Sequence, residues 1–337
     1  MINEQGERVI RRSFHMVMVL WLLAACGGTA MPAGQALTKI RLPMGYIPSV
    51  QYAPFYIAVD KGYFAEEGLE LEFDYRFETD GMKLVGAGEL PLAVVSGEQV
   101  PLARDKGLPV VYVLEWFQKF PVVIVAPVDR HIQTPADLAG KSVGLPGFFG
   151  ASYIGWRGLL DKAGLQEADV KVQDIGFTQA AAIQQGKVDA AVGYISNEPI
   201  VLRASGMDVD VIPVNDYVAL VANGIITNEK TIQDNPQLVR GFVRALLRGI
   251  KDAIADPELA FNTSKKFVDG LGSDPQNDTT QKQVLAESIK LWQAPVLGRS
   301  DPAAWDETQQ VLINMGLLKA KLPADKLYTN QFVDEVK

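Results

Sequence analysis

The sequence is poor in the two residue types that most often serve as nucleophiles and metal ligands. Of its 337 residues, one is cysteine, Cys26, and two are histidine, His15 and His131. A disulfide framework is excluded because it needs paired cysteines. Clustered zinc or iron ligands are missing, and with His15 in the N-terminal segment no Ser/His or Cys/His pair can be assembled around His131. We therefore expect no metal, no cofactor and no catalytic residues.

Basic residues are also in the minority. The 32 Lys and Arg residues face 40 Asp and Glu residues, which gives a net charge of -8 and a pI near 5.0. This balance argues against nucleic acid as a partner. Hydrophobic residues make up 48% of the chain, enough for a sizeable core divided into two lobes.

Long hydrophobic runs are missing as well. The apolar run at residues 16–23 is too short to span a bilayer, and it follows Arg8, Arg11 and Arg12. This pattern predicts a secretory signal peptide over residues 1–25. The adjoining Leu-Ala-Ala-Cys closely resembles the lipobox of bacterial lipoproteins, which implies that Cys26 becomes acylated. The Gly- and Ala-rich residues that follow predict a flexible tether over 26–38.

The body of the chain is organised around residues 43–74. An apolar strand ends at Pro43, a loop containing Tyr46 follows, a helix begins near Tyr52 and ends at Gly68, and a strand covers 69–74. In open α/β sheets, a loop between a strand and the start of a helix is where ligands bind. This loop carries no basic residue.

The same pattern of elements occurs twice. Strands at 40–42, 69–74 and 90–95 match strands at 142–145, 170–175 and 188–194, and the sequence Ser-Gly-Glu at 96–98 matches Ser-Asn-Glu at 196–198. Each half reads β-α-β-α-β, which predicts a parallel sheet covered by helices. We therefore expect an α/β protein of two similar lobes whose matching loops face one cleft.

The lobes are expected to share the chain unequally. The apolar, β-rich segments 120–128 and 217–228 predict the two connections between them. This places the first lobe at 39–127 plus 217–337 and the second at 128–216. After residue 228 the chain turns helical, with Asn or Asp followed by proline at three predicted helix starts, and these extra helices are expected to pack on the first lobe.

The loops expected at the cleft are rich in aromatic and acidic side chains and contain no Lys or Arg. The aromatic candidates are Tyr46, Tyr52, Trp116, Phe148, Phe149, Tyr153 and Tyr194. The polar candidates are Gln51, Asp80, Ser96, Glu98, Asn197 and Glu198. A phosphate, sulfonate or carboxylate ligand would call for basic residues, so these loops favour a neutral, nitrogen-rich ring stacked between aromatics.

Several of these residues also have a purely structural interpretation. Phe148 and Phe149 could belong to the core, although their position between two glycines favours a loop. Glu98 could act only on a helix dipole. Trp116 follows an apolar strand, so burial and ligand stacking are both open, and Trp292 is expected in the core.

Read together, three segments resemble one family. They are Gly-Tyr-Ile-Pro at 45–48, Ala-Pro-Phe-Tyr-Ile-Ala at 53–58 and Lys-Gly-Tyr-Phe at 61–64 with Gly-Leu at 68–69. They resemble the substrate-binding lipoproteins of ABC importers, in the thiamine-pyrimidine-synthase-like branch. The resemblance implies a two-lobed periplasmic-binding-protein fold of type II that closes on a small molecule. It also implies permease and ATPase partners, and a monomer anchored by lipid on Cys26 to the outer face of the cytoplasmic membrane.

Within that branch, the segment 46–56 looks like binders of riboflavin and of thiamine pyrimidine precursors. The Phe148-Phe149 doublet and the segment 77–81 favour riboflavin, with a hydroxymethyl or formylamino pyrimidine as the alternative. Alkanesulfonates are disfavoured by the missing arginine. Related pyrimidine-synthesis enzymes have a cysteine-rich motif and an active-site histidine, which this chain lacks, and a binding protein that reports to a sensor kinase stays open.

Overall fold

The first parallel pair of strands is the one that the sequence predicts around residues 43–74. In the computed structural model, which describes residues 36–336, β1 (Thr38–Pro43) pairs with β2 (Leu69–Asp74) in parallel register. Between them lie a 3-10 turn (Val50–Tyr52), α2 (Ala53–Asp60) and α3 (Tyr63–Glu66). The predicted single helix is thus interrupted, because Gly62 has a left-handed conformation with a φ of 75° between α2 and α3.

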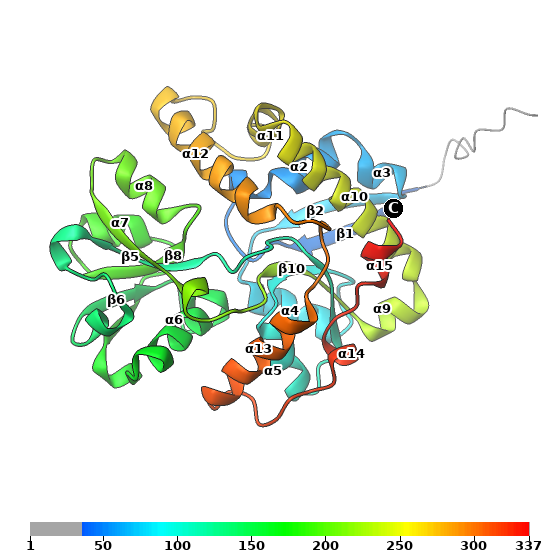
Figure 1. Ribbon diagram of the computed structural model, residues 1–337. Helices are drawn as coiled ribbons and strands as arrows, with labels where there is room; N and C mark the ends of the chain where they lie inside the picture. The colour runs from blue at the N-terminus through cyan, green and yellow to red at the C-terminus, as the bar shows by residue number, and fades with distance from the viewer. Residues whose placement is uncertain (1–35, 337) are drawn as a thin grey trace, which may run out of the picture. The chain divides into compact units, whose positions relative to one another are not determined.

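The remaining strands form two further sheets. One has the order β3-β10-β4, built from Ala93–Ser96, Asn223–Asn228 and Val110–Glu115. The other has the order β7-β6-β8-β5-β9, built from Lys171–Asp174, Ser142–Leu145, Ala190–Tyr194, Val122–Pro127 and Val209–Pro213. We call the part that carries the first two sheets the first lobe, and the part that carries the five-stranded sheet the second lobe (Figure 1).

The two lobes repeat one topology. β1 lies beside β3, so the strands of the first lobe follow the spatial order β2, β1, β3, β10, β4. This order matches β7, β6, β8, β5, β9 of the second lobe. In each lobe the fourth strand runs antiparallel to its neighbours, and it is the strand by which the chain has just entered that lobe. The predicted duplication is therefore present in the elements and in their order.

One predicted boundary differs from the structure. We expected the first lobe to extend to residue 127, but β5 pairs with β8 and β9 and so belongs to the second lobe. The chain therefore crosses before Val122, and it returns between β9 and β10. The apolar composition of 122–127 indicated a buried strand but carried no information about which sheet it joins.

Helices cover both lobes. The first lobe also has α4 (Glu78–Gly86) and α5 (Gln99–Asp105), and the second has α6 (Gly150–Ala163), α7 (Gln179–Gln184) and α8 (Glu198–Ala204). The helices after β10 are α9 (Glu229–Asp234), α10 (Pro236–Ala255), α11 (Pro257–Ser264), α12 (Pro275–Trp292), α13 (Pro302–Asn314), α14 (Ala324–Leu327) and α15 (Gln331–Asp334). No helix between residues 36 and 336 is both long and apolar enough to cross a membrane.

The predicted helix starts after residue 228 are confirmed. Asn235, Asp256 and Asp301 each accept a backbone N–H from the first turn of the following helix, and a proline follows each of them. Such side chains replace hydrogen-bond partners that the first turn of a helix lacks.

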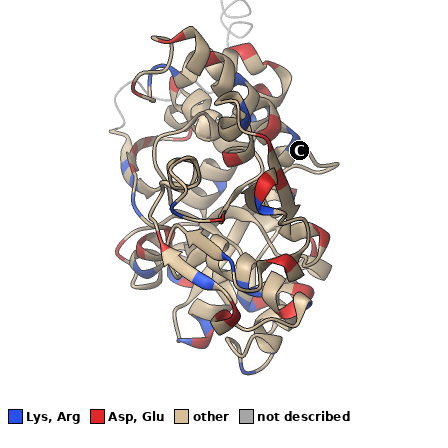
Figure 2. Ribbon diagram, turned by 90° about the vertical axis from the view of Figure 1, so that its left-hand side faces the viewer, with Lys and Arg blue, Asp and Glu red and all other residues tan. Residues whose placement is uncertain are grey.

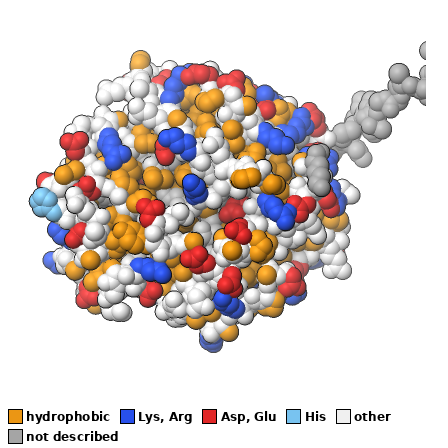
Figure 3. Space-filling view, viewed as in Figure 1, with side chains coloured by type: hydrophobic (Ala, Val, Ile, Leu, Met, Phe, Trp, Pro, Cys, Tyr) orange, Lys and Arg blue, Asp and Glu red, His pale blue; other side chains and the backbone are white. Residues whose placement is uncertain are grey.

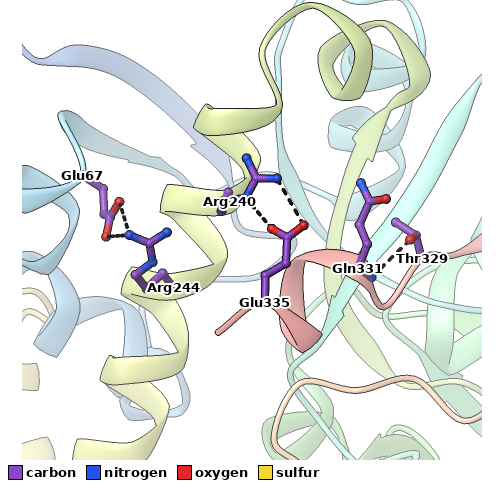
Figure 4. A network of polar contacts seen from close by, with 6 residues as sticks. All are labelled: Glu67, Arg240, Arg244, Thr329, Gln331 and Glu335. Carbon is purple, nitrogen blue, oxygen red and sulfur yellow. Dashed lines mark hydrogen bonds and ion pairs between the residues drawn. The ribbon is translucent and has the colours of Figure 1, made fainter. Parts of the chain in front are cut away.

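These helices pack mainly on the first lobe, as expected. α10 lies over α2 and α3, α11 lies on α2, and α14 and α15 lie on β4 (Figure 1). The amphipathic α10 also carries three arginines that form ion pairs, Arg248 with Glu66, Arg244 with Glu67, and Arg240 with Glu335 next to α15, and Figure 4 shows the last two. Contacts to the second lobe also occur: α12 contacts α8, and the carbonyl of Met315, at the end of α13, accepts from Arg157 of α6 over 3.5 Å.

Charges of both signs are interspersed over the described residues. Figure 2 shows Lys and Arg mixed with Asp and Glu over the ribbon, and the face in Figure 3 carries no large area of one sign. The predicted signal peptide (1–25), Cys26 and most of the predicted tether (26–38) lie outside the described residues.

Candidate ligand-binding site

A pocket lies between the two lobes, where the carboxyl ends of their strands meet. The space inside it, including open solvent at its mouth, amounts to about 820 Å³. Eight of the predicted site residues line it: Tyr46, Gln51, Tyr52, Trp116, Phe149, Tyr194, Asn197 and Glu198. Twelve further residues complete the wall: Met44, Gly45, Phe77, Glu78, Val94, Phe117, Pro146, Ala151, Ser152, Phe177, Gln179 and Asn223. None of these twenty is Lys or Arg.

Five predicted site residues lie elsewhere. Asp80 is in the first turn of α4 but does not reach the wall. Ser96 and Glu98 are fully buried: Ser96 donates its backbone N–H to the wall residue Glu78, and Glu98 is hydrogen-bonded to the Ser96 hydroxyl. Phe148 is 51% exposed and meets the edge of Tyr153, whose hydroxyl donates to Glu167 on the outer side of the second lobe.

The deep wall of the pocket is a stack of aromatic rings. Tyr52 is buried and lies against Trp116 with ring centroids 5.3 Å apart, and Trp292 continues the stack beyond Trp116 at 6.1 Å. The Tyr52 hydroxyl donates to the carbonyl of Met44 over 2.6 Å, which fixes the ring. Trp116 is buried, in agreement with the first interpretation, and it also lines the pocket, so stacking on a ligand stays a prediction. Trp292 is buried, as predicted.

A second aromatic group closes the mouth from both lobes. Phe77 of the first lobe meets Phe149 and Phe177 of the second at 4.9 and 5.3 Å, and Tyr46 meets Phe177 edge-on at 4.8 Å. Phe149 keeps 38% of its surface exposed. These four rings supply flat apolar faces at the entrance, and their contacts hold the lobes together in this structure.

Polar contacts also cross the pocket. The side-chain amide of Gln51 donates to the Ser196 hydroxyl over 2.8 Å, and the Tyr194 hydroxyl donates to the side-chain oxygen of Asn223 over 3.2 Å. A longer contact of 3.5 Å joins the amide of Asn197 to the hydroxyl of Tyr46. The structure therefore has the two lobes in contact around the pocket.

Glu198 provides a carboxylate from the second lobe. Its oxygens accept the backbone N–H of Tyr194 at 2.6 Å and the side-chain amide of Asn197 at 2.8 Å. Burial raises the pKa of Glu198, while these donors lower it. With Gln179 and Asn223 nearby on the same wall, this carboxylate offers acceptors to the N–H groups of a ring.

Glu78 provides a carboxylate from the first lobe. One oxygen accepts the backbone N–H of Ser96 at 2.8 Å, and the other accepts the backbone N–H of Ala151 in the second lobe at 3.1 Å. Burial raises the pKa of Glu78, whereas these hydrogen-bond donors lower it, and burial is the larger effect. The sequence analysis selected the segment 77–81, but it named Asp80 as the site residue in that segment and not Glu78. At the start of a helix both acidic residues fit the pattern, and nothing in the sequence ranks one over the other.

Glu78 and the buried Glu98 share one serine. The Ser96 hydroxyl oxygen lies 3.2 Å from Glu78 and 2.5 Å from Glu98, and it accepts the side-chain amide of Gln99. A hydroxyl has one hydrogen, so it cannot donate to both carboxylates. Burial and the neighbouring Glu78 hold the pKa of Glu98 well above its usual range. A protonated Glu98 that donates to Ser96 lets the serine donate to an anionic Glu78.

The internal repeat could have identified Phe177 and Gln179. Phe177 follows β7 as Phe77 follows β2, and both rings lie at the mouth of the pocket. Asn223 is different, because it is the first residue of the crossing strand β10 and lines the pocket only because that strand enters the sheet beside β3. Long-range pairing of this kind leaves no local signal.

The family described as NMT1/THI5 like matches residues 49–260. The chain belongs to this family. It is 39% identical to the riboflavin-binding protein RibY of Chloroflexus aurantiacus, over 94% of this chain and 96% of that protein. It is 29% identical to the formylaminopyrimidine-binding protein of Halalkalibacterium halodurans, over 87% and 90%. A 4-amino-5-hydroxymethyl-2-methylpyrimidine phosphate synthase of Legionella pneumophila is 22% identical, over 88% and 93%.

A solved structure confirms the fold. The alkanesulfonate-binding protein SsuA of Xanthomonas axonopodis, bound to MOPS, superposes with a TM-score of 0.68 over 87% of this chain and 98% of that one, at 14% identity. The NMT1/THI5-like chain therefore has the predicted two-lobed periplasmic-binding-protein fold. Identity this low carries no information about the ligand.

Proposed function

We propose that this protein is the ligand-binding component of an ABC importer and that it captures riboflavin between its two lobes. The main support is the wall of the pocket, which combines aromatic rings with two carboxylates and has no Lys or Arg among its twenty residues. A neutral ring system with N–H donors fits such a wall, because stacking on the rings and donation to carboxylates both stabilise it. The similarity to RibY over almost the whole chain points to the same ligand.

A thiamine pyrimidine precursor is the second candidate. The similarity to the formylaminopyrimidine-binding protein favours it, and an aminopyrimidine ring offers the same combination of flat faces and N–H donors. An alkanesulfonate is a poor fit because a sulfonate needs cationic or N–H donors at its oxygens, and no cationic side chain lines this pocket.

Catalysis is not part of the proposal. His131, around which no catalytic pair was expected, is exposed on the second lobe and does not line the pocket, and Cys26 precedes the described residues. The ligand is therefore expected to leave unchanged. Delivery to a permease, rather than to a sensor kinase, follows from the resemblance to importer components.

The anchoring of the protein is proposed from the sequence. The Leu-Ala-Ala-Cys segment supports acylation of Cys26 after signal cleavage, which would hold the protein at the outer face of the cytoplasmic membrane. We expect it to act there as a monomer.

Calorimetric titration distinguishes the ligands. The protein is titrated with riboflavin, with the aminopyrimidine and with taurine, and quenching of flavin fluorescence provides an independent signal for the first. We expect saturable one-to-one binding of riboflavin. Heat from the pyrimidine alone would favour the second candidate, and heat from taurine alone would contradict the role given to the lack of Lys and Arg in the wall.

A further inference from the structure

Glu78 is distinguished from the other pocket residues because its carboxylate binds backbone from both lobes. In the first lobe it is fixed by the N–H of Ser96 at 2.8 Å and by the Ser96 hydroxyl at 3.2 Å. Across the pocket it accepts the N–H of Ala151 at 3.1 Å. The other polar contacts that cross the pocket join neutral side chains, whereas this one joins a carboxylate to backbone. Hydrogen bonds of this charge-assisted kind are the stronger type.

The second lobe is shaped to receive this carboxylate. Ala151 is in the first turn of α6, a helix of 14 residues, where backbone N–H groups have no partner within the helix. The positive end of the helix dipole also favours a negative group there. The carboxylate thus satisfies a donor that the helix itself leaves open.

Gly150 makes the approach possible. A Cβ atom at this position would lie 2.3 Å from the nearer oxygen of Glu78, far inside contact distance, and the residue has a φ of 69°. Both the space and the backbone conformation therefore require glycine. Gly150 itself is not part of the pocket wall.

We propose that Glu78 is a positioning residue that locks the closed arrangement of the lobes, by accepting the Ala151 N–H across the pocket through the gap that Gly150 leaves. The inference rests on the proposed function in one respect, that the lobes close on a ligand. It adds the residue pair that holds them closed. Opening the lobes breaks the Ala151 contact but leaves Ser96 and Glu78 together in the first lobe.

Two glycine variants provide a matched test. Gly150→Ala places a methyl group against the Glu78 carboxylate, without changing any residue of the pocket wall. Gly164→Ala is the control, because Gly164 ends the same helix with a φ of 67° and its Cβ would meet nothing within 4 Å. Both variants place alanine at nearly the same positive φ at an end of α6, so a difference between them reports the contact with Glu78.

Closure is read from the distance between the lobes. In full-length protein with Cys26→Ser, spin labels are attached at Lys106→Cys and Gln185→Cys, which are exposed positions on the first and second lobes. We expect Gly150→Ala to shift the distance distribution toward longer values, both without ligand and with saturating riboflavin. Gly164→Ala should match the parent protein. Equal distributions for the two glycine variants would overturn the lock.

Riboflavin affinity gives a second measurement. We expect Gly150→Ala to raise the Kd about tenfold and Gly164→Ala to change it less than twofold. A cycle of Glu78→Ala, Gly150→Ala and the double variant tests the coupling. Once Glu78 is removed, the glycine substitution should have no further effect on closure, and full additivity would refute the pairing. If the parent protein bound no riboflavin, the proposed ligand would fail, while the ligand-free distances would still decide on the lock.

Discussion

At the scale of single residues, Phe148 and Phe149 illustrate how neighbours in sequence can differ in role. Phe149 lines the pocket and meets Phe77, whereas Phe148 points to Tyr153 and is 51% exposed. The doublet suggested a ligand contact, but only the direction of each side chain separates the two, and that direction depends on the start of α6.

This pair allows a controlled prediction. Phe149→Ala should weaken ligand binding by about 1 kcal/mol, roughly a fivefold rise in Kd, because one stacking face is lost. The melting temperature of the empty protein should stay nearly unchanged, since the ring is 38% exposed. Calorimetry and thermal melts measure the two effects. Phe148→Ala serves as the control and should alter neither, so an equal loss of affinity in both variants would contradict the assignment.

Glu115 is a buried acid outside the pocket wall. Burial raises its pKa from an ordinary value of 4.5 to about 8, and Asp301 adds to the effect. The folded state therefore holds a proton that the unfolded state releases above pH 4.5. Stability from this group is complete below that pH and is lost as pH rises through 8.

The corresponding variant is Glu115→Gln, which is neutral at every pH. Relative to it, the wild-type protein should lose free energy of unfolding between pH 5 and pH 9, on the order of 1–4 kcal/mol. Urea unfolding at the two pH values measures the difference. Glu72→Gln on β2 is an exposed control expected to show no such trend. A wild-type protein that gained stability relative to Glu115→Gln would reverse the predicted sign.

At the scale of elements, local signals located most helices and strands. β2 was predicted at its observed bounds, and the three Asn-Pro and Asp-Pro starts were correct because capping depends on adjacent residues. Local signals did not predict which strands pair with one another. β5 was assigned to the wrong lobe because its pairing with β8 and β9 involves residues more than 60 positions away.

The cap of α10 gives a prediction at this scale. Asn235 accepts the N–H of Leu238 at 3.2 Å, and α10 covers the helices of the first lobe. Asn235→Ala should reduce the free energy of unfolding by about 1 kcal/mol, whereas Asn235→Asp should be near neutral, because aspartate caps equally well. The midpoint of urea unfolding measures both. Equal losses in the two variants would mean that another feature of Asn235 matters.

At the scale of the whole molecule, the site was predictable in kind but not in full. The repeat indicated two lobes facing a cleft, and the loop composition indicated a wall of aromatic and acidic side chains without Lys or Arg. The rest depends on how the lobes meet. Glu78 reaches Ala151, and Asn223 reaches Tyr194, only because residues from different lobes are brought together.

Membrane attachment is a prediction for the whole chain. If Cys26 is acylated, the protein should be recovered with the membrane fraction, and Cys26→Ser should move it to the soluble fraction. Immunoblots of fractionated cells measure the distribution. Riboflavin binding by the Cys26→Ser protein should be unchanged, which separates anchoring from capture. Retention of Cys26→Ser on membranes would contradict a lipid anchor at this residue.

The position of β10 has a consequence for how the chain becomes a finished protein. This strand lies between β3 and β4, yet it is made after the whole of the five-stranded sheet. During synthesis, the first lobe emerges first, but its sheet lacks β10 until the whole second lobe has been made. The second lobe forms its sheet from one continuous segment of the chain. The first lobe is therefore begun first and completed last.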